Sequence, residues 1–161
     1  MPGCRSLLVH VQSSHAHVHN LAMSWDDMLD HHGRLKFWAR ASTDVEVVAG
    51  LSPDMHRDDD SLYHVVFGGD FNTRCWALEW GPQSVHRVAQ TNTPALLSAA
   101  EFRPLWLSVS HGELRAGAGA HQNQTRDILS HHYGHPNAPK FVTFATYRQR
   151  AVHILVDCAS E

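Results

Sequence analysis

Cysteine is scarce in this sequence of 161 residues. Its three cysteines, Cys4, Cys75 and Cys158, are too few and too far apart for a disulfide framework or a Cys-x-x-Cys zinc site. The first 25 residues contain one arginine and no acidic residue, which faintly resembles a mitochondrial transit segment, and they lack the apolar centre of a secretory signal. These features favour an intracellular protein in a reducing environment, without specifying the compartment.

Long apolar runs and an excess of either charge are also lacking. No stretch of 18 apolar residues is present, so we expect no membrane-spanning helix. Lys and Arg number 13 and Asp and Glu number 16, which leaves a net charge of -3 with neutral histidines. Because no Lys/Arg cluster offers the charge that phosphate binding needs, the sequence argues against a nucleic-acid partner.

Histidine, in contrast, is abundant, with 15 copies. His15, His17 and His19 alternate, so on a strand they would share one face, as a three-histidine zinc site requires, whereas on a flexible arm they would not be fixed. Histidines also recur at residues 131–135 and throughout the chain. Two interpretations stay open: a zinc-binding protein based on His15, His17 and His19, or a compositional bias without a dedicated metal site.

Strands dominate the expected fold. From residue 35 onwards apolar residues recur at every second position, as in strands with one buried face. We predict strands at residues 35–41, 45–51, 62–69, 74–80, 85–90, 105–110, 113–116, 141–147 and 152–157. Such strands must bury their apolar faces against another sheet, and no βαβ alternation is visible. The sequence therefore predicts an all-β fold, an antiparallel β-sandwich of jelly-roll-like type with a short N-terminal helix.

The expected core consists of the apolar residues that repeat at period two across these strands. Its members are Leu35, Phe37, Val45, Val47, Tyr63, Val65, Phe67, Trp76, Leu105, Leu107, Phe141, Val152 and Ile154. A chain of this length can bury such a core within one domain. We expect residues 35–161 to form the sandwich, and residues 1–34 to form an arm and the short helix.

Little helix is expected. Ser24 can cap a short helix over residues 24–33, because two acidic residues follow in its first turn. Pro94 at a first helical position indicates a helical turn within residues 91–102. Residues 117–139 are rich in Gly, His and Asn, and we expect them to form a long surface loop.

The stretch VVFGGDFNTRCWALEW, residues 65–80, places two glycines between two apolar segments. No helix with a Lys-Ser/Thr start follows these glycines, so we interpret them as a bend in a strand and not as a phosphate-binding loop. The polar side chains that follow either satisfy the backbone of the bend or bind a ligand. If the chain has a ligand site, we expect it here. The candidate residues are Asp70, Asn72, Thr73 and Arg74.

Tryptophan is also frequent, with five copies. An aromatic face can stack on a sugar ring, although tryptophans at strand positions more often pack in a core or on a sheet face. Trp106 lies in an expected strand and completes the set of candidate ligand-binding residues. A glycan-binding role is therefore considered beside a structural one.

Four segments, in this order, resemble one known family. They are FWARASTDVEVVAGLSPD, LYHVVFGGDFNTRCWALE, TPALLSAAEFRPLWLSVSHGELRAGAG and FVTFATY, and they span about residues 35–156. With their Gly-Gly-x-x-Asn-Thr and Thr-Pro-x-x-Leu-Ser steps, they resemble the domain named after farnesoic acid O-methyltransferase. The His-rich stretch at residues 117–139 and the ending FATYRQRAVHILVD depart from the family pattern. The resemblance implies an all-β module that occurs alone or within larger proteins.

The family name implies methyl transfer from S-adenosylmethionine to a small lipid acid. The common site for this cofactor needs a Gly-rich turn between a strand and a helix, followed by an acidic residue about 20 positions later. Gly117-Ala118-Gly119 is the only Gly-x-Gly step, and neither feature follows it. We therefore expect a non-catalytic binding or interaction module without a cofactor, for a protein or glycan partner, which could act as a subunit of a larger assembly. An S-adenosylmethionine-dependent methyltransferase and a histidine-based zinc protein are the alternatives.

Overall fold

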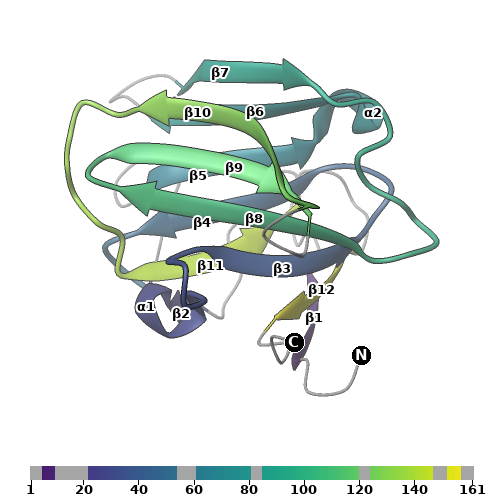
Figure 1. Cartoon of the computed structure of the whole chain (residues 1–161), viewed down its shortest axis with the longest axis horizontal. Helices are drawn as coiled ribbons and strands as arrows, with labels where there is room; N and C mark the ends of the chain where they lie inside the picture. Colours follow the sequence, from purple (N-terminus) through teal and green to yellow (C-terminus); the bar gives the residue numbers. More distant parts are fainter. Residues whose placement is uncertain are drawn as a thin grey trace.

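The computed structural model of the protein describes residues 5–9, 22–53, 61–80, 85–119, 124–146 and 152–156. Within these ranges the chain forms two six-stranded sheets that pack face to face (Figure 1). All strand pairs in both sheets are antiparallel. The predicted antiparallel β-sandwich is confirmed.

The first sheet has the strand order β1-β12-β3-β8-β9-β10. Its strands are β1 (Arg5–Val9), β3 (Leu35–Arg40), β8 (Arg103–Ser110), β9 (Glu113–Ala118), β10 (Arg126–His132) and β12 (Val152–Val156). The second sheet has the order β2-β11-β4-β5-β6-β7. Its strands are β2 (Met23–Ser24), β4 (Val45–Gly50), β5 (Ser61–Gly68), β6 (Arg74–Trp80), β7 (Val85–Asn92) and β11 (Phe141–Ala145). The chain before residue 35 thus contributes one described strand to each sheet.

The expectation of one long surface loop at residues 117–139 is wrong, because β10 lies within it and pairs with β9. A bulge between Asp127 and Leu129 interrupts the pairing. Ile128 and Leu129 are consecutive, yet both are buried, with 8% and 6% of their surface exposed. A bulge abolishes the simple alternation by which a strand is recognised in a sequence, which explains why this strand was not predicted.

Helix is confined to single turns in the described chain. α1 (Trp25–Met28) is shorter than the predicted helix over residues 24–33. The chain turns back directly after it, since Leu29 forms a β-bridge with Leu35, and Asp30 accepts two backbone hydrogen bonds within that turn. No helix in the described ranges is long and apolar enough to cross a membrane.

The helical turn predicted within residues 91–102 is absent. β7 includes the first two of these residues, and non-helical turns follow. Their backbone groups bond to a distant segment: the N–H of Thr93 donates to the carbonyl of Thr73 at 2.8 Å, and that of Ala95 to the carbonyl of Asn72 at 3.0 Å. These long-range bonds take the place of intrahelical ones.

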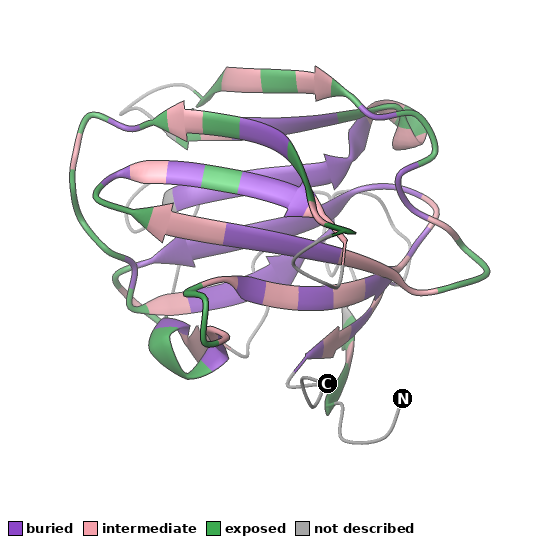
Figure 2. Ribbon diagram, in the orientation of Figure 1, coloured by how far each residue is buried: buried purple, intermediate pink, exposed green. Residues whose placement is uncertain are grey.

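The core lies between the sheets and is formed by their inward faces. β3 shows the alternation clearly, with every second residue buried (Figure 2). All but two members of the predicted core belong to the buried core cluster, and the exceptions are Trp76 and Phe141. In β6 the neighbours Cys75 and Ala77 fill the core, so Trp76 lies on the opposite face of its sheet. The alternation along β6 was predicted correctly, but the wrong set of alternate residues was assigned to the core.

The last strands of the two sheets, β7 and β10, lie side by side along one side of the sandwich (Figure 1). The hydroxyl of Thr91 in β7 donates to the carbonyl of Ile128 in β10 at 2.7 Å. This hydrogen bond joins the two sheets near one end of these strands.

Candidate functional site

The Gly68-Gly69 pair opens a left-handed turn between β5 and β6, α2 (Gly69–Asn72). Three consecutive residues other than glycine have positive φ angles: 50° at Asp70, 61° at Phe71 and 64° at Asn72. For L-residues this conformation is unfavourable by about 1–2 kcal/mol per residue, because Cβ approaches the next carbonyl oxygen. Such strain persists only where the surrounding structure enforces it, and it clusters in functional segments.

Side chains of the turn itself hold it in place. The Nδ2 amide of Asn72 donates to the carbonyl of Leu97 at 2.9 Å, and the N–H of Leu97 donates to Oδ1 of Asn72 at 3.0 Å. The hydroxyl of Thr73 donates to the carbonyl of Asp70 at 2.6 Å, and the N–H of Thr73 to the carbonyl of Gly69 at 3.0 Å. Asn72 and Thr73 therefore act on the backbone of the turn and of the segment beside it.

Both glycines allow close packing beneath the turn. Gly68 has a φ of 66°, and a Cβ at this position would overlap the side chain of Leu97. A Cβ on Gly69 would overlap the indole of Trp76. The carbonyl of Gly68 also accepts a hydrogen bond from the hydroxyl of Thr43 at 2.8 Å. The glycines thus bring the turn down onto the end of its own sheet, which explains them without a bound phosphate.

Asp70 lies between two arginines on the outside of the turn. Its Oδ2 is 3.3 Å from Nη1 of both Arg74 and Arg87, and these side chains are 40–45% exposed. The guanidinium of Arg87 also lies over the ring of Trp76, with Cζ 3.6 Å from the ring centroid. Two arginines against one aspartate leave one positive charge on this surface.

Phe71 projects from the same turn with 72% of its surface exposed, more than any other large apolar side chain in the described chain. We call Asp70, Phe71, Arg74 and Arg87, together with the buried ring of Trp76 beneath Arg87, the turn surface. An exposed aromatic ring and arginines on one surface have the composition typical of energetic hot spots in protein interfaces. This arrangement can bind, but it brings together no nucleophile and general base.

The turn surface contains one residue that the sequence did not indicate, Arg87. It reaches Asp70 because the antiparallel pairing of β6 and β7 shifts in register between Ala77 and Leu78, which places Arg87 opposite Leu78. A bulge of this kind depends on the packing of both sheets and has no clear sequence signal. Only the basic character of Arg87, at an exposed strand position, could have suggested it.

Trp106 does not belong to the turn surface. It lies in β8 of the other sheet, is 1% exposed, and has Cζ of Arg34 at 4.2 Å from its ring centroid. A Cβ on Gly117 would overlap its indole ring. A ring packed in this way offers no open face to a sugar. The other sequence candidates, His15, His17 and His19, lie outside the described residues.

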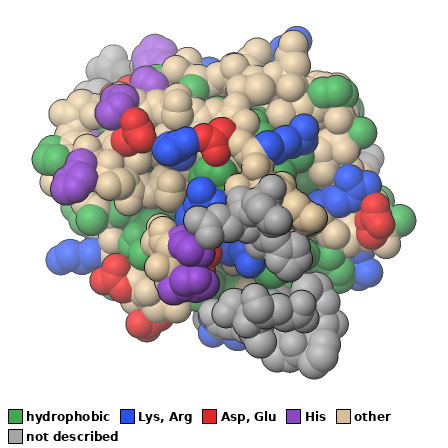
Figure 3. Space-filling view, viewed as in Figure 1, with side chains coloured by type: hydrophobic (Ala, Val, Ile, Leu, Met, Phe, Trp, Pro, Cys, Tyr) green, Lys and Arg blue, Asp and Glu red, His purple; other side chains and the backbone are tan. Residues whose placement is uncertain are grey.

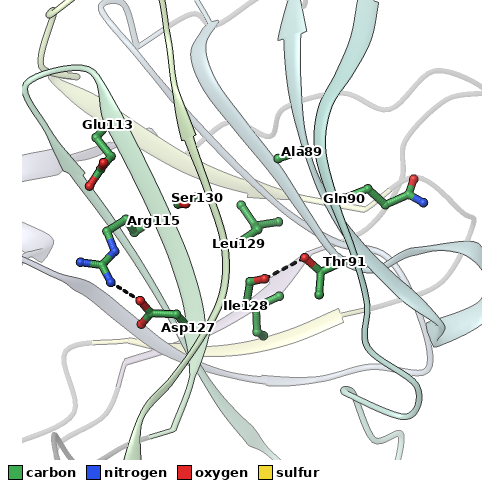
Figure 4. A pocket seen from close by; sticks show the side chains of 9 residues that line it. All are labelled: Ala89, Gln90, Thr91, Glu113, Arg115, Asp127, Ile128, Leu129 and Ser130. Carbon is green, nitrogen blue, oxygen red and sulfur yellow. Dashed lines mark hydrogen bonds and ion pairs between the residues drawn. The ribbon is translucent and has the colours of Figure 1, made fainter.

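A groove runs between β7 and β10, with a volume of 630 Å³ (Figure 4). It is lined by residues 89–91 of β7, by Glu113 and Arg115 of β9, and by residues 127–130 of β10. Arg115 forms an ion pair with Asp127, and Glu113 Oε2 lies 2.7 Å from Nε2 of His132. The groove is thus polar and open to solvent.

The buried titratable groups either keep their protons at neutral pH or are paired with another side chain. Burial raises the pKa of the Cys75 thiol to about 12, and burial also raises the pKa values of Tyr63 and Tyr133. A thiol with such a pKa keeps its proton at neutral pH and is a poor nucleophile. Glu46 and His64 form a buried pair on the second sheet, with Oε1 and Nε2 2.7 Å apart.

The described residues do not fit the common S-adenosylmethionine site. After β9 the described chain continues into the antiparallel β10, whereas the common site needs a helix at this point. Gly117 packs against Trp106 and the backbone of Arg126, and a Cβ on Gly119 would crowd the carbonyl of Gln124. These glycines permit close backbone approach between strands. In the described part of the chain, no group of three or more His, Cys, Asp or Glu side chains could hold a metal ion.

Comparison with known proteins gives one family and a set of solved structures. The family model described as farnesoic acid O-methyl transferase matches residues 13–160. No curated protein matches the chain. Among solved structures, the chain is similar to the crystal structure of the TRIM65 PSpry domain, with 12% identity and a TM-score of 0.43 over 76% of this chain. It spans 61% of the length of that domain chain. Because the family model covers residues 13–160, the chain belongs to the farnesoic acid O-methyl transferase family.

Proposed function

We propose that this domain is a non-catalytic interaction module that binds a protein partner through the turn surface. The observation that carries the proposal is Phe71, which is 72% exposed on a turn of three consecutive left-handed residues. Leaving a phenylalanine in water gives up roughly 1.5–3 kcal/mol of burial energy, and the turn adds backbone strain. A segment with both features, and with hydrogen bonds that enforce them, is well suited to binding.

The chemistry of the turn surface favours a protein over a glycan. Aromatic and arginine side chains dominate protein interface hot spots, and Phe71 follows Asp70, which pairs with Arg74 and Arg87. Arg87 covers the ring of Trp76, which removes the tryptophan from sugar stacking and leaves Phe71 as the exposed ring of the turn surface. The surface carries one net positive charge, so we expect a partner with an apolar pocket next to a carboxylate.

Two variants test this proposal. Phe71→Ser should leave the fold intact, because the side chain is exposed, and should weaken the partner's binding by at least about 2 kcal/mol, or roughly 30-fold. Leu51→Ser is the matched control, since Leu51 is an exposed apolar residue, at 44%, just beyond β4. Proteins captured from the native source should be lost with Phe71→Ser and retained with Leu51→Ser, and calorimetry with the purified partner should give the affinity difference. Equal capture by both variants would contradict the proposal.

A glycan array, probed with the same proteins, addresses the other partner class. We expect no glycan signal that depends on Phe71. A signal that Phe71→Ser removes, in the absence of any protein partner, would replace the protein with a glycan as the ligand.

The proposed module needs no cofactor, which thermal denaturation can test. A ligand at 100 times its dissociation constant stabilises the folded state by about 2.7 kcal/mol. We expect no shift in melting temperature with millimolar S-adenosylmethionine or with its demethylated product. A saturable calorimetric titration with either compound would instead support the methyltransferase alternative. A shift with Zn²⁺ that disappears when His15, His17 and His19 are replaced would support the zinc-binding alternative.

A further inference from the structure

The groove between β7 and β10 lies between two strand edges. In the described chain β7 pairs only with β6, and β10 pairs only with β9, so each is the last strand of its sheet. β7 is eight residues long and β10 seven, and neither strand contains proline or lysine, two residues that commonly block pairing at sheet edges. An edge with such a composition is a template to which another extended segment can add.

The size and lining of the groove suit a short extended chain. Its volume of 630 Å³ lies within the range of about 300–1,000 Å³ that ligand sites occupy. Thr91 and Ser130 contribute hydroxyl groups, which can bond to peptide N–H and C=O groups (Figure 4). Ala89 and Leu129 contribute the apolar part of the lining. No aromatic ring is among the described residues that line the groove, which argues against sugar stacking.

The charges of the groove indicate what the peptide carries. Acidic and basic side chains lie next to each other on the face of the molecule that carries β9 and β10 (Figure 3). Among the described lining residues, Glu113 and Asp127 oppose a single Arg115, so these residues carry one net negative charge. A lysine or arginine side chain on the bound segment complements this charge.

The bulge in β10 favours a single peptide over a second copy of this domain. It lies between Asp127 and Leu129 and interrupts the regular edge. The hydrogen bond from Thr91 to the carbonyl of Ile128 closes one end of the groove. Bulges and charged edges hinder the pairing of one rigid sheet edge with another. A flexible segment can adapt to the remaining open part.

We propose that this groove binds an extended peptide segment of a partner protein, which adds as a strand to the edge of β10 and directs a lysine or arginine toward Glu113. The site borders the turn surface, since Nη1 of Arg87 donates to Oε1 of Gln90 at 3.0 Å, but it does not rest on the function proposed there. The peptide backbone supplies affinity through main-chain hydrogen bonds, and the basic residue supplies specificity.

An array of nine-residue synthetic peptides, probed with the whole chain, tests the proposal. The recovered peptides should contain a lysine or arginine within an otherwise uncharged, β-forming sequence. Glu113→Gln should weaken their binding about two- to fivefold, as expected for a partly exposed charge pair. Glu101→Gln is the matched control, because Glu101 is an ion-paired, exposed carboxylate outside the groove, and it should change nothing. Phe71→Ser should also leave peptide binding unchanged, which separates this site from the turn surface.

N-methylation of the peptide backbone gives the decisive measurement. A strand added to an edge bonds through alternate residues, so methylation in one register should weaken binding about tenfold or more, and methylation in the other should have little effect. Bound peptide should slow amide hydrogen exchange in β7 and β10. Equal effects of both methylation registers, protection at the turn surface instead, the absence of any binding peptide, or glycan binding that Glu113→Gln removes would each overturn the proposal.

Discussion

Asn72 and Leu97 are joined by two hydrogen bonds, at 2.9 and 3.0 Å, in which the amide of Asn72 pairs with the backbone N–H and C=O of Leu97. Asn72 has a φ of 64°, a conformation that asparagine tolerates better than most residues. One side chain therefore satisfies two roles: it adopts the left-handed conformation, and it ties the turn to the segment that follows β7. Phe71 directly precedes Asn72, so this connection helps to fix its position in the turn.

Replacement of Asn72 should destabilise the fold and disturb the turn surface together. We expect Asn72→Ala to lower the free energy of unfolding by about 2–3 kcal/mol, because two hydrogen bonds are lost and alanine is strained at positive φ. Asn92→Ala is the control, since Asn92 is exposed at the end of β7, and it should change stability by less than about 0.5 kcal/mol. Urea denaturation measures both. Equal stability of the two variants would show that the pairing with Leu97 is unimportant.

Gly69→Ala tests the close packing beneath the turn. The new methyl group would overlap the indole of Trp76, which lies under the guanidinium of Arg87. Overpacking of this kind costs about 1–3 kcal/mol, and we expect a change in tryptophan fluorescence as the ring moves. Gly134→Ala is the control because nothing lies within 4 Å of a Cβ at that position. If Gly69→Ala matched the control in stability and fluorescence, the packing argument would fail.

The sequence was sufficient for the fold class because strands with one buried face show a period of two. In β3, Leu35, Phe37 and Ala39 are fully buried, and the residues between them are partly exposed. The pattern was insufficient where a strand is irregular. In β10 the bulge places Ile128 beside Leu129 in the interior, and this strand was not predicted.

The candidate site was only partly accessible from the sequence. The glycine pair and the polar residues after it indicated a bend, which residues 68–72 form. The sequence could not show that the bend is left-handed, because this conformation depends on hydrogen bonds to Leu97 and Thr93, about 20 residues away in the chain. For the same reason it did not indicate Arg87. Local sequence predicted the presence of a turn, and long-range contacts determined its shape.

Cys75 should be unreactive in the folded protein. Burial raises the pKa of its thiol to about 12, and the thiolate is the form that reacts with alkylating agents. In a variant with Cys4→Ser and Cys158→Ser, we expect alkylation at pH 8 to be roughly a thousandfold or more slower in buffer than in urea, because reaction requires opening of the fold. Rapid alkylation in buffer, measured by mass spectrometry, would contradict the burial of this residue.

The same thiol makes stability depend on alkaline pH. Its folded pKa, at about 12, lies above the ordinary value of 9.0, so the folded state retains a proton that the unfolded state releases. The contribution to stability is complete below pH 9 and is lost as the pH rises toward 12, by about 1.4 kcal/mol per pH unit. Cys75→Ala should reduce this slope. An unchanged slope in the variant would assign the alkaline loss to other groups, such as Tyr133, whose pKa burial also raises.

The buried pair of Glu46 and His64 should show strong energetic coupling. Their side chains are only 4% and 6% exposed; Oε1 of Glu46 pairs with His64, and its Oε2 has no hydrogen-bond partner in the described chain. His64→Leu would leave a buried carboxylate without its partner, and we expect it to cost about 3–5 kcal/mol. The double variant Glu46→Leu/His64→Leu should be more stable than His64→Leu alone, because it removes the unpaired carboxylate.

A double-mutant cycle by urea denaturation should give a coupling of about 2–3 kcal/mol between Glu46 and His64, whereas the exposed pair of Arg115 and Asp127 should give less than about 1 kcal/mol. Equal coupling in the two cycles would mean that burial adds nothing to the Glu46–His64 interaction.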